Sequence, residues 1–113
     1  MRSRIVWILT LATVLGCSHA DGPTNETPQV TTADVYTPGL VFSPFSTTIP
    51  VNGIVRFNLT GVAHDVTFTA VAGAPASIPV TQNQTVSRTF STKGTFPYDC
   101  RTHPGMSGEV IVQ

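Results

Sequence analysis

The sequence has few charged residues, which make up 11% of its 113 positions, and its formal net charge is zero. Binding to nucleic acid or to an acidic membrane surface through charge requires a basic excess, so neither partner is predicted. Long apolar runs are missing as well. The longest, residues 5–16, does not reach the length of a membrane-spanning helix. A chain of this length allows one domain.

Helical periodicity is absent after this apolar run, and short β-prone segments alternate with glycine and proline turns. Roughly seven or eight such segments predict an all-β protein, folded as an antiparallel β-sandwich. The pattern alone fits an immunoglobulin-like module equally well. The bulky side chains expected in its core are Phe42, Phe45, Phe57, Phe68, Phe90, Phe96 and Tyr98.

Turn signals set the expected limits of these strands. Asn52-Gly53 predicts a tight hairpin turn. Residues 73–82 contain two prolines and several small residues, so we expect an irregular connection from one sheet to the other. The expected strands are 35–42, 46–51, 54–59, 64–70, 85–90, 95–100 and 109–113.

The N-terminus has the pattern of an export signal, because Arg2 and Arg4 precede the apolar run. Val14-Leu15-Gly16-Cys17 resembles a bacterial lipobox, in which lipidated Cys17 becomes the new N-terminus. The competing interpretation is ordinary cleavage after Ala20. We predict a lipoprotein signal at 1–16, a flexible tether at 17–32 that is small, polar and proline-containing, and a folded domain at 33–113.

Three metal-binding side chains are spaced at intervals of three residues near the C-terminus: Cys100, His103 and Met106. Thiolate, imidazole and thioether together are donors that select copper. A fourth donor is expected upstream, and His64 begins an alternating segment there, whereas His19 falls in the signal or tether. The alternative for Cys100, a disulfide with Cys17, would tie a flexible tail to this motif.

A His-Asx-Val strand start followed by Tyr-x-Cys-x-x-His-x-x-Met-x-Gly resembles the cupredoxins, the small type 1 blue copper proteins of the plastocyanin and amicyanin type. The resemblance covers residues 35–113, and the spacing gives a short, amicyanin-like ligand loop. It implies a Greek-key β-sandwich holding one copper ion. The resemblance assigns His64, Cys100 and His103 to the copper plane and Met106 to the weak axial position.

Other residues around this site have expected roles. The family commonly has Asn after the first histidine; here it is Asp65, expected to accept hydrogen bonds from Arg101 or Thr102. The alternative is an ordinary exposed strand aspartate. The carbonyl of Ala63 is a reserve donor. Residues expected to contact a redox partner around His103 are Val62, Ala63, Pro104 and Gly105.

The resemblance implies a one-electron carrier that shuttles between a donor and an acceptor protein outside the cytoplasm. The alternative is copper sequestration or delivery, although the Met-rich or repeated His tracts typical of copper carriers are missing. An enzyme is not predicted, because no second metal cluster or open coordination position is visible. We expect a periplasmic or cell-surface monomer, attached to a membrane surface if Cys17 is lipidated.

Overall fold

The computed structural model describes Gly16 and residues 31–113. The rest of the predicted signal peptide, the lipidation site Cys17, His19 and nearly all of the predicted tether lie outside the described residues. Within the described part of the chain, no helix has the length and hydropathy needed to cross a membrane.

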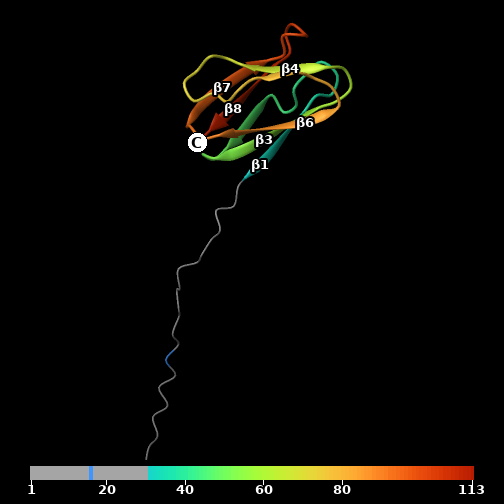
Figure 1. Ribbon diagram of the computed structural model, residues 1–113. Helices are drawn as coiled ribbons and strands as arrows, with labels where there is room; N and C mark the ends of the chain where they lie inside the picture. Colours follow the sequence, from blue (N-terminus) through green and yellow to red (C-terminus); the bar gives the residue numbers. More distant parts are fainter. Residues whose placement is uncertain (1–15, 17–30) are drawn as a thin grey trace, which may run out of the picture.

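Eight strands form two sheets that pack face to face (Figure 1). One sheet has the order β1-β3-β6 and the other β2-β8-β7-β4-β5. The bounds are β1 Thr32–Tyr36, β2 Ser46–Ile49, β3 Gly53–Leu59, β4 His64–Phe68, β5 Ile78–Thr81, β6 Gln84–Phe90, β7 Gly94–Asp99 and β8 Ser107–Val112. The predicted all-β sandwich is confirmed, and its crossovers are consistent with a Greek key.

Two strand pairs are parallel, which differs from the predicted antiparallel pairing. β1 pairs with β3 and β2 pairs with β8, in both cases parallel. The connection between β1 and β2 carries the chain from one sheet to the other, and both strands lie at sheet edges. Parallel neighbours need such long connections, because a two-residue turn joins only antiparallel strands.

The Asn52-Gly53 turn forms but does not make the expected hairpin. Asn52 has a left-handed φ of 68°, and the Gly53 amide donates to the Pro50 carbonyl at 2.9 Å. The strands on either side, β2 and β3, belong to different sheets. The turn residues therefore predict a change of direction correctly, whereas the pairing depends on which sheet buries each strand.

Two prolines account for further differences in the five-stranded sheet. Ile78–Thr81, expected to be irregular, forms β5 at the sheet edge, where Pro79 is tolerated. β4 ends at Phe68 rather than at residue 70. There the Thr69 amide donates to the Pro97 carbonyl at 2.9 Å, and Pro97 has no N–H to return the bond, so the ladder stops.

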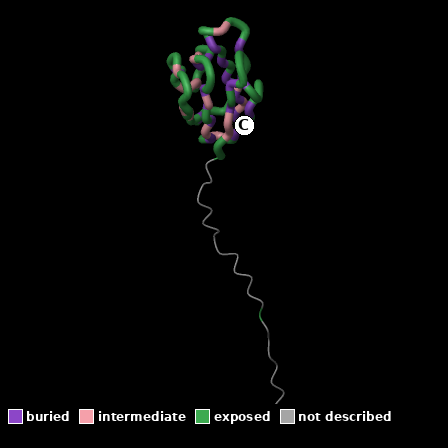
Figure 2. Tube along the Cα trace, turned by 90° about the vertical axis from the view of Figure 1, so that its right-hand side faces the viewer, coloured by how far each residue is buried: buried purple, intermediate pink, exposed green. Residues whose placement is uncertain are grey.

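Buried residues, purple in Figure 2, are distributed along the strands. Their side chains form one core cluster in which aromatic residues are the largest members. Tyr98 makes edge-to-face contacts with Phe42, Phe57 and Phe68 at centroid distances of 4.9, 5.3 and 5.7 Å. The prediction that Phe45 lies in the core is wrong, because its side chain is 56% exposed. Phe45 lies in the connection just before β2, outside the alternation that buries Thr47 and Ile49.

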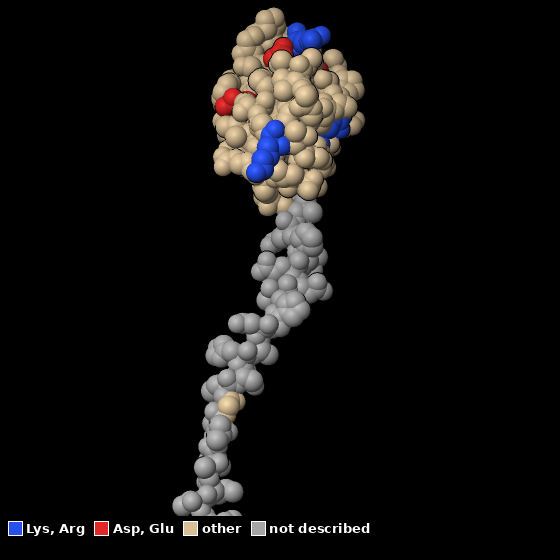
Figure 3. All heavy atoms as spheres, turned by 90° about the vertical axis from the view of Figure 1, so that its left-hand side faces the viewer, with Lys and Arg blue, Asp and Glu red and all other residues tan. Residues whose placement is uncertain are grey.

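Charged side chains are sparse on the surface, as the mostly uncharged face in Figure 3 shows. Among the described residues, one salt bridge joins Arg56 to Asp34 at 2.6 Å across β3 and β1. Arg56 is exposed and Asp34 is partly exposed, so solvent screens this pair and it contributes little to stability.

Gly108 gives a test of how closely β7 and β8 pack. It lies opposite Tyr98, and a Cβ added to it would be 2.5 Å from the Tyr98 hydroxyl oxygen. Gly108→Ala should lower the free energy of unfolding by about 1–3 kcal/mol, the usual cost of overpacking. Chemical denaturation measures this. The exposed neighbour Ser107→Ala is the control, and equal stability of the two variants would contradict the packing described here.

Candidate metal centre

The predicted donors come together at one end of the sandwich. His64 is the first residue of β4, and Cys100 follows β7 directly. His103 and Met106 lie in the loop that joins β7 to β8, which projects from the body of the molecule in Figure 1. The strands thus deliver two donors from their ends and the loop supplies the others.

Backbone hydrogen bonds close this loop on itself. The Cys100 amide donates to the Met106 carbonyl at 2.8 Å, and the Met106 amide donates to the His103 carbonyl at 3.1 Å. A further bond runs from the His103 amide to the Cys100 carbonyl at 3.3 Å. The Cys-x-x-His-x-x-Met spacing therefore matches two successive turns, and each turn begins and ends at a donor residue.

His64, Cys100 and His103 form a compact cluster. One potential ligand atom from each residue lies within 4.8 Å of the other two. The Cys100 sulfur is 3.5 Å from Nδ1 of His103, and the two imidazole rings have centroids 5.0 Å apart. Cys100 is a free thiol in the structure. Three soft or borderline donors thus converge from two separate parts of the chain.

Solvent reaches this cluster through only one of its members. His64 is fully buried and Cys100 is 1% exposed, whereas His103 is partly exposed. Met106 is 2% exposed at the end of the loop, and its role as a fourth donor stays a prediction. The same holds for the Ala63 carbonyl as a reserve donor.

His64 is the observation that fits the cluster to a metal. Neither of its ring nitrogens has a hydrogen-bond partner among the described residues, although both are buried. Burial lowers the pKa of His64, and neighbouring His103 lowers it further, while the Thr60 backbone and Asp65 oppose the shift. The ring therefore stays neutral with a free lone pair, which is the form that binds a metal.

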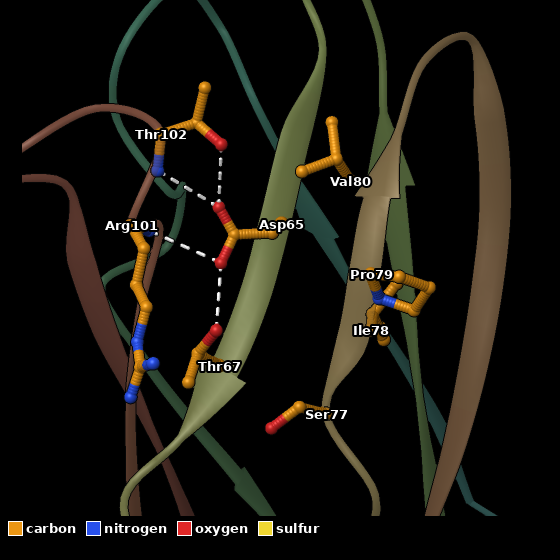
Figure 4. A pocket seen from close by; sticks show the side chains of 8 residues that line it. All are labelled: Asp65, Thr67, Ser77, Ile78, Pro79, Val80, Arg101 and Thr102. Atoms are coloured by element: carbon orange, nitrogen blue, oxygen red, sulfur yellow. Dashed lines mark hydrogen bonds between the residues drawn. The ribbon is translucent and has the colours of Figure 1, made fainter.

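Asp65 is buried rather than an exposed strand residue, being 5% exposed. Its carboxylate accepts hydrogen bonds from the Arg101 amide at 3.2 Å and the Thr102 amide at 3.0 Å, the two residues that the sequence predicts as donors (Figure 4). The Thr102 and Thr67 hydroxyl groups also donate, at 2.8 and 2.7 Å. Thr67 was not predicted as a hydrogen-bond donor to Asp65. Its position two residues further along the same face of the strand is a signal that could have indicated it.

These hydrogen bonds keep Asp65 ionised. Burial alone would raise the pKa of Asp65, but the bonds from Thr67, Thr102 and Arg101 outweigh it and hold the pKa well below its ordinary value. A fixed negative charge therefore lies immediately beside the donor cluster.

A cavity of about 590 Å³ lies beside the donor cluster, and no sequence pattern predicts it. Figure 4 shows it between the start of the ligand loop and β5, with β4 as its floor. Its lining is Asp65, Thr67, Ser77, Ile78, Pro79, Val80, Arg101 and Thr102. None of the predicted metal donors is among them, so this cavity is separate from the candidate metal centre.

Comparison with protein-family models and with curated proteins finds no match. Solved structures do match. A methionine variant of amicyanin in the Cu(I) state has a TM-score of 0.66 and 27% identity, with 73% of this chain and 82% of that chain covered. A purple cupredoxin from Nitrosopumilus maritimus has a TM-score of 0.63 and 23% identity, over 72% and 99% of the two chains.

A copper-containing nitrite reductase from Thermus scotoductus SA-01 also matches. Its TM-score is 0.66 and its identity 28%, over 72% of this chain. This chain spans only 22% of that much longer protein. The likeness therefore concerns one part of the reductase.

His64→Leu tests whether the buried imidazole is retained for metal rather than for stability. Leu has a similar volume and leaves no nitrogen unpaired, so the metal-free variant should be more stable than metal-free wild type by about 1–3 kcal/mol. It should also lose copper binding. Thermal denaturation with a chelator present, and copper titration without it, measure the two effects. A destabilised variant would show that the ring nitrogens have partners in solution.

The fold, the donor cluster and the structural likenesses agree with one another. The sandwich places a thiol and two imidazoles at one end, and the unpaired nitrogens of His64 suit a single copper ion. Amicyanin and the purple cupredoxin are matched over most of their length. The chain is a cupredoxin.

Proposed function

We propose that this cupredoxin is a one-electron carrier with a mononuclear type 1 copper site formed by His64, Cys100, His103 and Met106. The observation that supports it best is the closed donor cluster, in which a thiol and two imidazoles converge and only His103 reaches solvent. With Met106 as the fourth donor, this set would leave no coordination position open for a substrate, whereas an electron can pass through the ring of His103.

The residues of the site keep the donors in place during electron transfer. Bound copper supplies the chemistry by alternating between Cu(II) and Cu(I). His64 is fixed at the start of β4, and the hydrogen bond from the Cys100 amide to the Met106 carbonyl closes the loop. Rigid donors favour transfer because little rearrangement accompanies a change of oxidation state.

His103 is the proposed port for electrons. Around it, Val62, Pro104 and Gly105 are exposed and Ala63 is partly exposed, with Val62 at 51%. None of these residues is charged, so a redox partner is expected to dock on a small uncharged surface, with little long-range steering. The donor and acceptor proteins would use this surface in turn, with the carrier acting as a monomer.

Other functions are less well supported. Copper sequestration or delivery remains the alternative. A protein that delivers copper must release the ion, whereas a buried and saturated donor set would hold it firmly. The likeness to a nitrite reductase covers only 22% of that chain and therefore does not support the activity of the whole reductase for this protein. We place the protein outside the cytoplasm, in the periplasm or at the cell surface, held by a lipid on Cys17; the N-terminal sequence pattern supports this location.

Cys100→Ser should abolish a strong visible absorption band on addition of Cu(II), because thiolate-to-copper charge transfer near ~600 nm requires the sulfur. Cys17→Ser is the matched control and should keep the band, while releasing the protein from membranes. Spectra and membrane fractionation measure both. A folded Cys17→Ser protein without the band would contradict the assignment of Cys100 as the copper thiolate. Wild-type protein that is soluble and begins at Asp21 would contradict the lipid anchor on Cys17.

Met106 tests the fourth donor. Met106→Leu removes the thioether at similar volume and should raise the reduction potential, because thioether donation to copper is lost. Met106→Gln supplies a harder oxygen donor, which stabilises Cu(II), and should lower the potential. Protein-film voltammetry gives both values. If neither variant differs from wild type, Met106 only packs beneath the loop and the Ala63 carbonyl becomes the next candidate.

A further inference from the structure

A short segment, residues 60–63, connects β3 to the buried His64, the first residue of β4. The ladder of β3 ends at Leu59, and the ladder between β4 and β5 begins at His64 with an irregular register. The segment therefore lies outside the strand ladders on both of its sides. Side chains from two other parts of the chain hold its backbone instead.

Thr37 holds the first residue of this segment. It follows β1 directly and is buried, at 3% exposure. Its Oγ1 accepts a hydrogen bond from the Thr60 amide at 3.0 Å. The hydroxyl proton can be donated to the Thr60 carbonyl at 3.3 Å or to the Asn58 carbonyl at 3.2 Å. One hydroxyl can thus serve both backbone groups of Thr60, because it is a donor and an acceptor.

The sequence around Thr37 fixes the position of this hydroxyl. Pro38 restricts the residue before it to extended conformations, and Gly39 then turns the chain with a left-handed φ of 71°. Tyr36 and Ser43 exchange two backbone hydrogen bonds, at 2.8 and 2.9 Å, which close the turn. The hydroxyl is therefore presented from a closed piece of backbone.

Gln82 and Asn83 hold the next residue of the segment, Gly61. The Gln82 side-chain amide donates to the Gly61 carbonyl at 2.8 Å, and Oδ1 of Asn83 accepts from the Gly61 amide at 3.1 Å. Both residues directly follow Thr81, which is the partner of His64 in the ladder between β4 and β5. Their side chains thus continue the pairing past the point where the strand begins.

We propose that Thr37 is a positioning residue of the metal centre: by holding Thr60, it sets the place at which His64 enters the donor cluster. The side-chain pair on the turn between β5 and β6 does the same for the next residue. Donor groups need such support, because displacements of about 0.5 Å disturb a site. The hold on the segment is a property of the metal-free protein, whereas its effect on bound copper rests on the proposed function.

Hydrogen exchange in the metal-free protein tests the hold on the segment. Thr37→Val keeps a similar volume without the hydroxyl, so the Thr60 amide should exchange about threefold to tenfold faster, as expected for one lost hydrogen bond. Thr37→Ser retains the hydroxyl and should keep the exchange slow. Thr47→Val is the matched control, because the Thr47 hydroxyl is buried without a partner in the described part of the chain. Wild-type exchange at Thr60 in Thr37→Val would overturn the proposal.

Spectra of the proteins loaded with Cu(II) show whether this hold positions a ligand or only adds stability. A displaced His64 alters the geometry around the copper, so Thr37→Val should change the relative intensities of the thiolate-to-copper bands. Thr37→Ser and Thr47→Val should keep the wild-type spectrum. A purely structural role would lower the Tm of Thr37→Val with no change in the bands, which would refute the positioning role. An equal change in Thr37→Ser would also refute it, because the hydroxyl would then not be responsible.

A second set of variants applies if Thr37→Val does not fold. Gln82→Ala combined with Asn83→Gly removes two exposed side chains, and glycine tolerates the φ of 54° at position 83. The Gly61 amide should exchange faster and the Cu(II) bands should change. Gln84→Ala, at a neighbouring exposed position, is the control and should alter neither. A double variant that matches wild type in both measurements would contradict the proposal.

Failure of the proposed function would be recognised separately. If wild-type protein binds copper without an intense visible band, the type 1 site is wrong and the effect on the bands falls with it. The exchange rates of the Thr60 and Gly61 amides would still decide whether these side chains hold the segment before His64.

Discussion

The burial of donor atoms that no group in the described part of the chain satisfies is the constraint on which this structure depends. A histidine with two unpaired nitrogens in a packed interior costs free energy of folding, and the surrounding fold must supply it. The aromatic core around Tyr98, immediately below the ligand loop, is the part of the molecule that provides the compensating packing. Packing between the sheets thus offsets the cost of burying the unpaired His64 nitrogens at the end of the sandwich.

The two parts of the chain that form the donor cluster are held in different ways. His64 is held by the strand pairing of β4, which is buried. Cys100, His103 and Met106 are held by a loop with its own hydrogen bonds. Asp65 joins the two, since it belongs to the strand but receives the amides of the loop. A small movement of the loop therefore disturbs the carboxylate as well as the donors.

The sequence predicted the sandwich and the pairing of Cys100 with His103 because alternation and ligand spacing are local signals, whereas His64 joined this group through the family resemblance. Strand pairing was less predictable, since β5 and the parallel pairs depend on which sheet buries each segment. The resemblance led to the expectation that Asp65 accepts a hydrogen bond from Arg101 or Thr102, but its burial and its contact with Thr67 depend on packing that the sequence does not reveal. The exposure of Phe45 could not be read from its hydrophobicity, because burial is decided by neighbours far away in the sequence.

For the electron carrier proposed above, the partial exposure of His103, beside a fully buried His64, would limit the order of events during turnover. A carrier with a single opening to its metal has one docking position, so the protein that gives an electron and the protein that receives it compete for the same place. Each must leave before the other arrives. Complexes that persist would therefore slow the carrier, and selection should favour brief encounters, with dissociation rather than electron tunnelling setting the pace of the cycle.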